Sequence, residues 1–148
     1  MAAIESAHGI IVRTRPLTET SLIVHWLTPA AGRIATVAKG ARRTQSPFLG
    51  KLDLFYEADF SFSRSRRGDL HTLREIKLVG TRGPIRQDLL KLGRAAYACA
   101  FIEQATEVET PMPAVFELLQ GFLDALCELR PSAQTVLAFE LKLLEEFL

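Results

Sequence analysis

The sequence predicts an α+β protein in which a strand-rich first part is followed by a helical second part. Up to residue 80, short apolar or β-branched segments are separated by turn-forming or basic clusters, in the number and spacing typical of a small barrel or sandwich. Beyond Pro84, apolar residues recur at three- and four-residue steps, which is the period of a helix. Because the period changes between Gly80 and Pro84, we expect two domains, residues 1–80 and residues 81–148.

Five segments of the first part are predicted to be strands: 9–14, 21–28, 33–39, 52–63 and 70–79. The segment 52–63 alternates most clearly, and its apolar face is expected to pack inwards: Leu54, Tyr56, Ala58, Phe60 and Phe62. The opposite face is expected mostly to meet water: Asp53, Glu57, Asp59 and Ser61. Phe60 and Phe62 are therefore predicted as core residues, and base stacking on exposed rings is the less favoured alternative.

The third predicted strand ends in a cluster of positive charge. A turn at Pro29 and Gly32 precedes the strand, which is followed by Lys39-Gly40-Ala41-Arg42-Arg43. Glycine lets the backbone approach a ligand closely, and guanidinium groups match phosphate oxygens, so the cluster is a candidate phosphate-binding site. A solvated basic loop is the alternative. Phe48 lies in the same loop outside any alternation, and it is a candidate ring for the stacking of bases.

The second part is predicted to form three helices. The first starts at Pro84 and continues to about Thr106 through an apolar series: Leu89, Leu92, Ala96, Cys99 and Ala100. Residues 110–113 end it and start the second, whose apolar stripe is Val115, Leu118, Leu119, Phe122, Leu126 and Leu129. Arg130-Pro131 ends this second helix, and Ser132 is a suitable N-cap for the third.

The last predicted helix has an apolar arc too wide for one buried side: Val136, Leu137, Phe139, Leu141, Leu143, Leu144, Phe147 and Leu148. It also lacks a glycine cap or a basic last turn. We expect either a chain shortened at its C-terminus, or a helix that buries its surplus face against another molecule. A central position in a small helical bundle is an equally good alternative.

The net charge of +1 conceals an asymmetry between the two parts. Residues 1–80 hold twelve Lys and Arg against seven Asp and Glu, a net charge of +5, whereas residues 81–148 hold six against ten, a net charge of −4. The first part is therefore the candidate nucleic-acid face. No apolar run approaches the ~18 residues that a membrane helix needs, and residues 1–5 do not read as a signal peptide, so we expect a cytoplasmic protein with no membrane partner.

Signatures of catalysis or metal binding are scarce. The sequence has no phosphate loop of the form G-x-x-x-x-G-K-[ST], no H-E-x-x-H and no G-x-S-x-G, so we expect no enzyme activity and no cofactor. His8, His25 and His71 are dispersed and are interpreted as ordinary strand residues. Asp53, Glu57 and Asp59 could be imagined as the metal-binding carboxylates of a nuclease. Their spacing is equally that of the solvent-exposed face of a strand, which is the interpretation we prefer. Cys99 and Cys127 are predicted to be buried thiols, with a disulfide as the minor alternative.

The order of residues in the basic strand and its flanks resembles the RecO family of bacterial recombination mediators. The matching elements are Leu27-Thr28, Gly32-Arg33-Ile34, Val37 to Arg43 and Ser46, with further matches at 13–21, 70–75 and 139–144. The resemblance is specific over residues 9–80 and looser to Leu148. It implies an N-terminal five-stranded OB-fold β-barrel that binds DNA and a C-terminal all-helical domain. Family members commonly carry a C-terminal zinc cluster of four cysteines. This chain has two cysteines and therefore differs from the family pattern there.

The resemblance also implies a function: annealing single-stranded DNA and helping to load recombinase onto DNA covered by single-strand-binding protein. Single-strand-binding protein and RecR are the implied protein partners, and the recombinase filament is an indirect one. The candidate DNA-binding residues are the cations of the first part: Arg15, Arg33, Lys39, Arg42, Arg43, Lys51, Arg64, Arg66 and Arg67. No base-reading pattern is visible, so we expect binding without sequence preference. The alternatives are a protein-interaction adaptor with a structural barrel, and an OB-type RNA or ribosome-associated factor.

Overall fold

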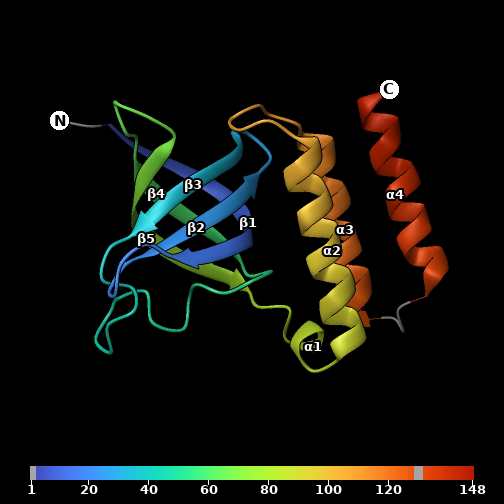
Figure 1. Cartoon of the computed structure of the whole chain (residues 1–148), viewed down its shortest axis with the longest axis horizontal. Helices are drawn as coiled ribbons and strands as arrows, with labels where there is room; N and C mark the ends of the chain where they lie inside the picture. Colours follow the sequence, from blue (N-terminus) through green and yellow to red (C-terminus); the bar gives the residue numbers. More distant parts are fainter. Residues whose placement is uncertain (1–2, 129–131) are drawn as a thin grey trace.

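A closed five-stranded barrel is followed by helices packed against one of its sides (Figure 1). The computed structural model describes residues 3–128 and 132–148. The strands are β1 (Ile4–Pro16), β2 (Leu22–Thr28), β3 (Gly32–Ala38), β4 (Glu57–Ser63) and β5 (Leu70–Gly80). They follow one another around the barrel in the order β1-β2-β3-β5-β4, and only the β3–β5 pair is parallel. This confirms the predicted OB-fold barrel with a helical part after it.

Strand β1 is longer than the sequence analysis predicted, because it serves two neighbours. Its first half pairs with β4, from Ile4 opposite Ser63 to Ile10 opposite Glu57. Its second half pairs with β2 and contains an irregularity between Ile11 and Arg13. One strand that changes partners in this way lets five strands close into a barrel without an exposed edge.

Strand β4 is shorter than predicted, because residues 53–56 form a turn instead of its first half. Phe55 has a φ of 70° and is almost fully buried, and its amide donates to the carbonyl of Ile11 over 2.8 Å. The predicted alternation fails here: Phe55 is buried, whereas Leu54 and Tyr56 are half-buried. Glu57, expected on the wet face, is buried as well.

The barrel interior is filled by aromatic and branched side chains. Trp26 stacks on Phe60 with 3.9 Å between ring centroids, and Phe62 lies beside Phe60. The prediction that Phe60 and Phe62 are core residues is confirmed. Phe48 belongs to the same cluster and is only 7% exposed, so the proposal that bases stack on its ring is wrong.

The helices are α1 (Gly83–Arg86), α2 (Leu89–Ala105), α3 (Pro113–Glu128) and α4 (Ala133–Phe147). The first predicted helix is divided in two, because Asp88 caps the start of α2 by accepting from the amides of Leu90 and Lys91. Ser132 caps α4 as predicted, accepting from the amide of Thr135. The predicted end of the second helix at Leu129 and Arg130-Pro131 lies outside the described residues.

The barrel and the helices share one apolar core. Ile10, Val12 and Leu27 of β1 and β2 form a cluster with side chains of α2 and α3, such as Ile102 and Leu119. Cys99 is buried in this cluster, and burial raises the pKa of its thiol to about 12. Cys127 is half-buried and both thiols are free, so the disulfide alternative is wrong.

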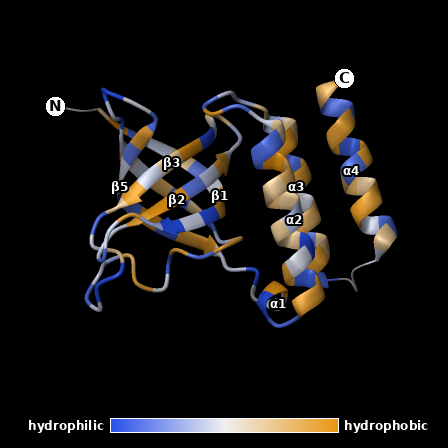
Figure 2. Ribbon diagram, in the orientation of Figure 1, coloured by the Kyte–Doolittle hydropathy of each residue, from blue (hydrophilic) through white to orange (hydrophobic). Residues whose placement is uncertain are grey.

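Helix α4 lies on the outer side of the helical layer and packs on α3 (Figure 1). Phe139 and Leu143 are buried against the cluster, whereas Leu137, Leu141 and Leu144 are about half exposed. Figure 2 shows hydrophobic residues along α4. The alternative that placed this helix at the centre of a bundle is therefore wrong.

Candidate nucleic-acid interface

A cleft of about 410 Å³ lies on the outer face of β1, β2 and β3. Three arginines line it, Arg13 and Arg15 from β1 and Arg33 from β3, and His25 of β2 lies between them. Asp69, at the end of the β4–β5 loop, is the carboxylate among the lining residues, and Val108 of the α2–α3 connection forms part of the wall. Three guanidinium groups against one carboxylate make this cleft suited to an anion.

The β-bulge in β1 brings two of these arginines into the cleft. Ile11 lies opposite Trp26 and packs into the barrel, whereas Arg13 lies opposite His25 and Arg15 opposite Ile23. Strict alternation would have placed Arg13 on the same face as Ile11. The extra residue at the bulge instead turns Arg13 and Arg15 outwards, a common use of bulges beside functional sites.

The pKa of His25 is affected by the positive charge of the cleft. Its Nε2 atom accepts from Arg13 and from Arg15, each over 3.4 Å. Burial, followed by the charges of Arg13, Arg15 and Arg33, lowers the pKa of His25 to about 4. The imidazole is therefore neutral at pH 7, and it adds an acceptor without adding charge.

Two of the three cleft arginines are also held by the helical part. The guanidinium of Arg33 donates to the hydroxyl and the carbonyl oxygen of Thr106, over 2.7 and 2.6 Å. Arg13 forms an ion pair with Glu103 at 3.3 Å. Among the residues that the structure describes, no carboxylate pairs with Arg15, which is exposed.

The basic cluster predicted after the third strand forms a tight turn beside the β1–β2 turn. Gly40 has a φ of 69°, a left-handed conformation that glycine adopts more readily than other residues. Arg42 binds the neighbouring turn, with its amide donating to the carbonyl of Thr20 over 3.0 Å and its guanidinium to that of Thr18 over 2.9 Å. Lys39 and Arg43 are exposed. Lys39 directly follows the end of β3, six residues and roughly 20 Å along the chain from Arg33. We call the cleft arginines together with Lys39, Arg42 and Arg43 the cationic track.

The remaining candidates are not brought together to the same extent. Arg64 is held by Glu5 and by Glu109, the latter at 2.5 Å, so its charge is already balanced. Arg66 and Arg67 are exposed in the β4–β5 loop, whose last residue, Asp69, lines the cleft. Lys51 lies apart, beside Phe48.

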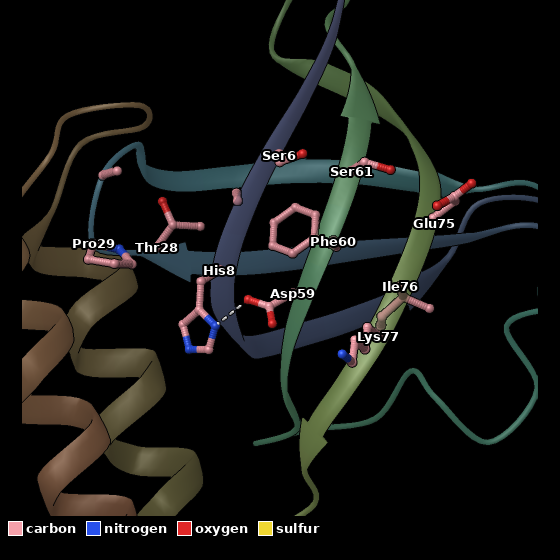
Figure 3. A pocket seen from close by; sticks show the side chains of 12 residues that line it. Ser6, His8, Thr28, Pro29, Asp59, Phe60, Ser61, Glu75, Ile76 and Lys77 are labelled. Atoms are coloured by element: carbon pink, nitrogen blue, oxygen red, sulfur yellow. Dashed lines mark hydrogen bonds and ion pairs between the residues drawn. The ribbon is translucent and has the colours of Figure 1, made fainter.

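A larger hollow, of about 600 Å³, lies on the opposite side of the barrel and has a different character (Figure 3). Asp59 and Glu75 line it together with His8 and Lys77. Two carboxylates disfavour phosphate, so the smaller cleft is the better candidate for binding an anion.

His8 connects this hollow to the buried junction between barrel and helices. Its Nδ1 contacts Asp59 at 2.8 Å and its Nε2 contacts Glu57 at 2.5 Å. Burial lowers the pKa of His8, but the hydrogen bonds to Asp59 and Glu57 outweigh it, and the pKa is raised overall. The two carboxylates lie at opposite nitrogens of one ring, and no group of His, Cys, Asp and Glu in the described residues is arranged to hold a metal ion.

Sequence reasoning missed Arg13 and His25 as site residues. The spacing of Arg13 and Arg15 carried a signal, since two residues apart on a strand means one shared face. The bulge that selects the outer face was not visible in the sequence. His71, interpreted as an ordinary strand residue, is buried and binds Ser65 and Glu109.

No helix among the described residues is both long and apolar enough to cross a membrane. Comparison with known proteins covers both parts of the chain. Residues 1–82 match the family described as recombination protein O N terminal, and residues 86–147 match recombination protein O C terminal.

Individual relatives agree with the family match. DNA repair protein RecO of Listeria monocytogenes serotype 4b (strain CLIP80459) is 31% identical over 140 residues, which is 95% of this chain and 54% of the relative. DNA repair protein RecO of Alkaliphilus metalliredigens (strain QYMF) is 33% identical over 138 residues, 93% of this chain and 55% of the relative. The chain thus spans about half the length of these curated relatives.

Proposed function

This chain belongs to the RecO family, and from that premise we propose that it binds single-stranded DNA in bacterial recombinational repair. The proposed site is the cleft with Arg13, Arg15 and Arg33, extended along β3 to the turn with Lys39, Arg42 and Arg43. Arg66 and Arg67 of the β4–β5 loop are proposed as further phosphate contacts. The outer face of β2 and β3 and the loop after β4 are the surfaces that OB-folds use for oligonucleotides.

One observation carries the proposal: Arg13, Arg15 and Arg33 line the same cleft, around a histidine that is neutral at pH 7. The three guanidinium groups repel one another in the free protein, and Asp69 is the one carboxylate among the residues that line the cleft. A phosphate in the cleft would offset that repulsion and accept from the guanidinium groups.

Binding of this kind is expected to be largely independent of sequence. The proposed contacts are with phosphates, which carry no sequence information. Annealing then needs no covalent step, because screening the repulsion between two strands lowers the barrier to their pairing. We accordingly propose a DNA-binding mediator in the cytoplasm without enzyme activity of its own.

We propose the protein partners from membership of the RecO family: single-strand-binding protein, RecR and, indirectly, the recombinase filament. Loading recombinase onto covered DNA requires contacts with proteins as well as with DNA. The half-exposed leucines of α4, Leu137, Leu141 and Leu144, support a protein-binding role for the helical part. An adaptor with a purely structural barrel is therefore the second candidate.

A competition experiment tests the proposal. A labelled oligonucleotide is bound to the protein, and fluorescence anisotropy follows its displacement by single strands of unrelated sequence, by duplex DNA and by RNA of matching sequence. We expect all single DNA strands to compete about equally and complementary strands to anneal faster with protein present. Clear preference for RNA would favour the alternative of an RNA or ribosome-associated factor. Failure to bind any of these nucleic acids at low salt would favour the protein-interaction adaptor.

A further inference from the structure

The connection between α2 and α3 reaches across from the helices to the barrel and contacts the wall of the arginine cleft (Figure 1). Val108 lines the cleft, and its backbone pairs with that of Arg33 of β3 in an isolated parallel β-bridge. The amide of Glu109 donates to the carbonyl of Arg33 over 2.8 Å. Residues 103–109, the last turn of α2 and the start of the connection, are thus one place where the acidic half of the chain touches the basic half.

Three barrel arginines are bound by this one short segment. Arg13 pairs with Glu103, Arg33 donates to Thr106, and Arg64 pairs with Glu109. Two of the three partners are carboxylates, which are the side chains that most resemble a phosphate oxygen in charge and in hydrogen bonding.

The contact is fixed in place rather than a chance approach of exposed side chains. Glu109 has a φ of 55°, a conformation that costs free energy in a residue other than glycine and persists only where its surroundings impose it. A Cβ atom on Gly32 would lie 2.4 Å from the carbonyl oxygen of Thr110, so the β2–β3 turn and the connection pack without spare room. The connection is therefore held against the barrel at Glu109, whereas Glu103 is placed by the last turn of α2.

We propose that Glu103 and Glu109 act as internal competitors of DNA phosphate, occupying Arg13 and Arg64 in the free protein and being displaced when DNA binds. The inference rests on the proposed function, because it assigns to the helical part control over the affinity of the barrel cleft. Binding would remain reversible, because the arginines released by DNA return to carboxylates that are already in position. A mediator that has to release the annealed duplex benefits from such a limit on affinity.

The test compares three substitutions that each remove one negative charge. Glu103→Gln and Glu109→Gln keep a hydrogen-bond acceptor and remove the competing charge. Glu128→Gln is the control, since Glu128 is exposed at the far end of α3, about 22 Å along the helix from Pro113 and beyond the ~10 Å over which charge acts at 0.1 M salt. Affinity for a single-stranded oligonucleotide is measured by anisotropy at several salt concentrations, and folding is checked by thermal unfolding.

We expect Glu103→Gln to tighten DNA binding about two- to fivefold, the range for an ion pair that is partly exposed. Glu109→Gln should tighten it less, because Arg64 keeps its ion pair with Glu5. The plot of log affinity against log salt should also steepen by up to about one unit, since no freed carboxylate takes up a cation. The control substitution Glu128→Gln should leave both the affinity and the salt dependence nearly unchanged. Should Glu109→Gln lower the melting temperature, Glu103→Gln carries the test alone.

Three results would overturn the inference. Equal tightening by all three substitutions would mean that only net charge matters. Unchanged or weaker binding by the cleft variants would mean that the carboxylates do not compete with DNA. If the unaltered protein binds no single-stranded DNA, both the proposed function and this inference are wrong. The other two results differ from this one, because in both of them the unaltered protein binds DNA.

Discussion

Replacing Arg82 by Leu is expected to destabilise the junction between barrel and helices strongly. Arg82 donates to Glu57 at 2.6 Å and to Asp124 at 3.0 Å, and it also binds the carbonyl of Phe55 at 3.1 Å. The side chains of Arg82 and Glu57 are only 8% and 9% exposed, so the substitution leaves a buried carboxylate without its cation. Breaking a buried pair in this way costs about 3–5 kcal/mol.

We expect the lower end of that range, because Glu57 keeps hydrogen bonds from His8 and Gln120. For a chain of this size, about 3 kcal/mol corresponds to a fall of roughly 6–12 °C in melting temperature. Thermal unfolding followed by circular dichroism at pH 7 measures it, with Lys77→Leu on the exposed side of β5 as the control. A fall no larger than the control's would refute the reasoning.

A second substitution separates the unpaired charge from the loss of packing. Glu57→Gln in the Arg82→Leu background removes the buried charge, so it should recover part of the lost stability. Equal or greater destabilisation of the double variant would mean that the cost comes from the shape of Arg82 and not from its charge.

Three further predictions concern pH, backbone packing and metal. His8 has a raised pKa, so its stabilising effect is complete below its unfolded pKa of about 6.5 and is lost as pH rises through the folded value; the melting temperatures of the unaltered protein and His8→Gln should therefore differ more at pH 5.5 than at pH 9. Gly32→Ala should lower the melting temperature well beyond Gly40→Ala, because both glycines have a φ of 69° but only at Gly32 would the Cβ meet a backbone atom, in Thr110; equal losses would argue against close packing there. Chelator should leave the melting temperature unchanged, and a large fall with stoichiometric zinc would contradict the expectation that no metal supports the fold.

Most of the fold could be predicted from residue patterns because those patterns arise from local physics. Alternation located β2, β3 and β5, and the apolar steps located α2, α3 and α4. The failures lie where long-range contacts decide the conformation. Phe55 adopts a positive φ and enters the core beneath the helices, and Phe48 folds onto the barrel from a loop that shows no alternation.

The site was predictable in its charge but not in its geometry. The basic composition of the first part and the glycine turn at Gly40 were correct pointers to exposed cations. The pairing of Arg64 with Glu5 and Glu109 could not be predicted, because the partners are 59 and 45 residues away. The burial of Glu57 depends in the same way on Arg82, which a strand pattern does not contain.

The most direct test of the account is a salt titration of single-stranded DNA binding by a variant of the cationic track. Arg15, Lys39 and Arg43 are replaced by Ala, and the control replaces Lys77, Lys91 and Lys142, which lie outside the cleft and carry the same total charge. The account predicts weaker binding to every sequence and a slope of log affinity against log salt that flattens by about two units, roughly 0.7 for each lost contact, with stability changed by no more than about 0.5 kcal/mol per site. Equal slopes and affinities in the two variants would contradict it and remove this face of the barrel from the DNA-binding site.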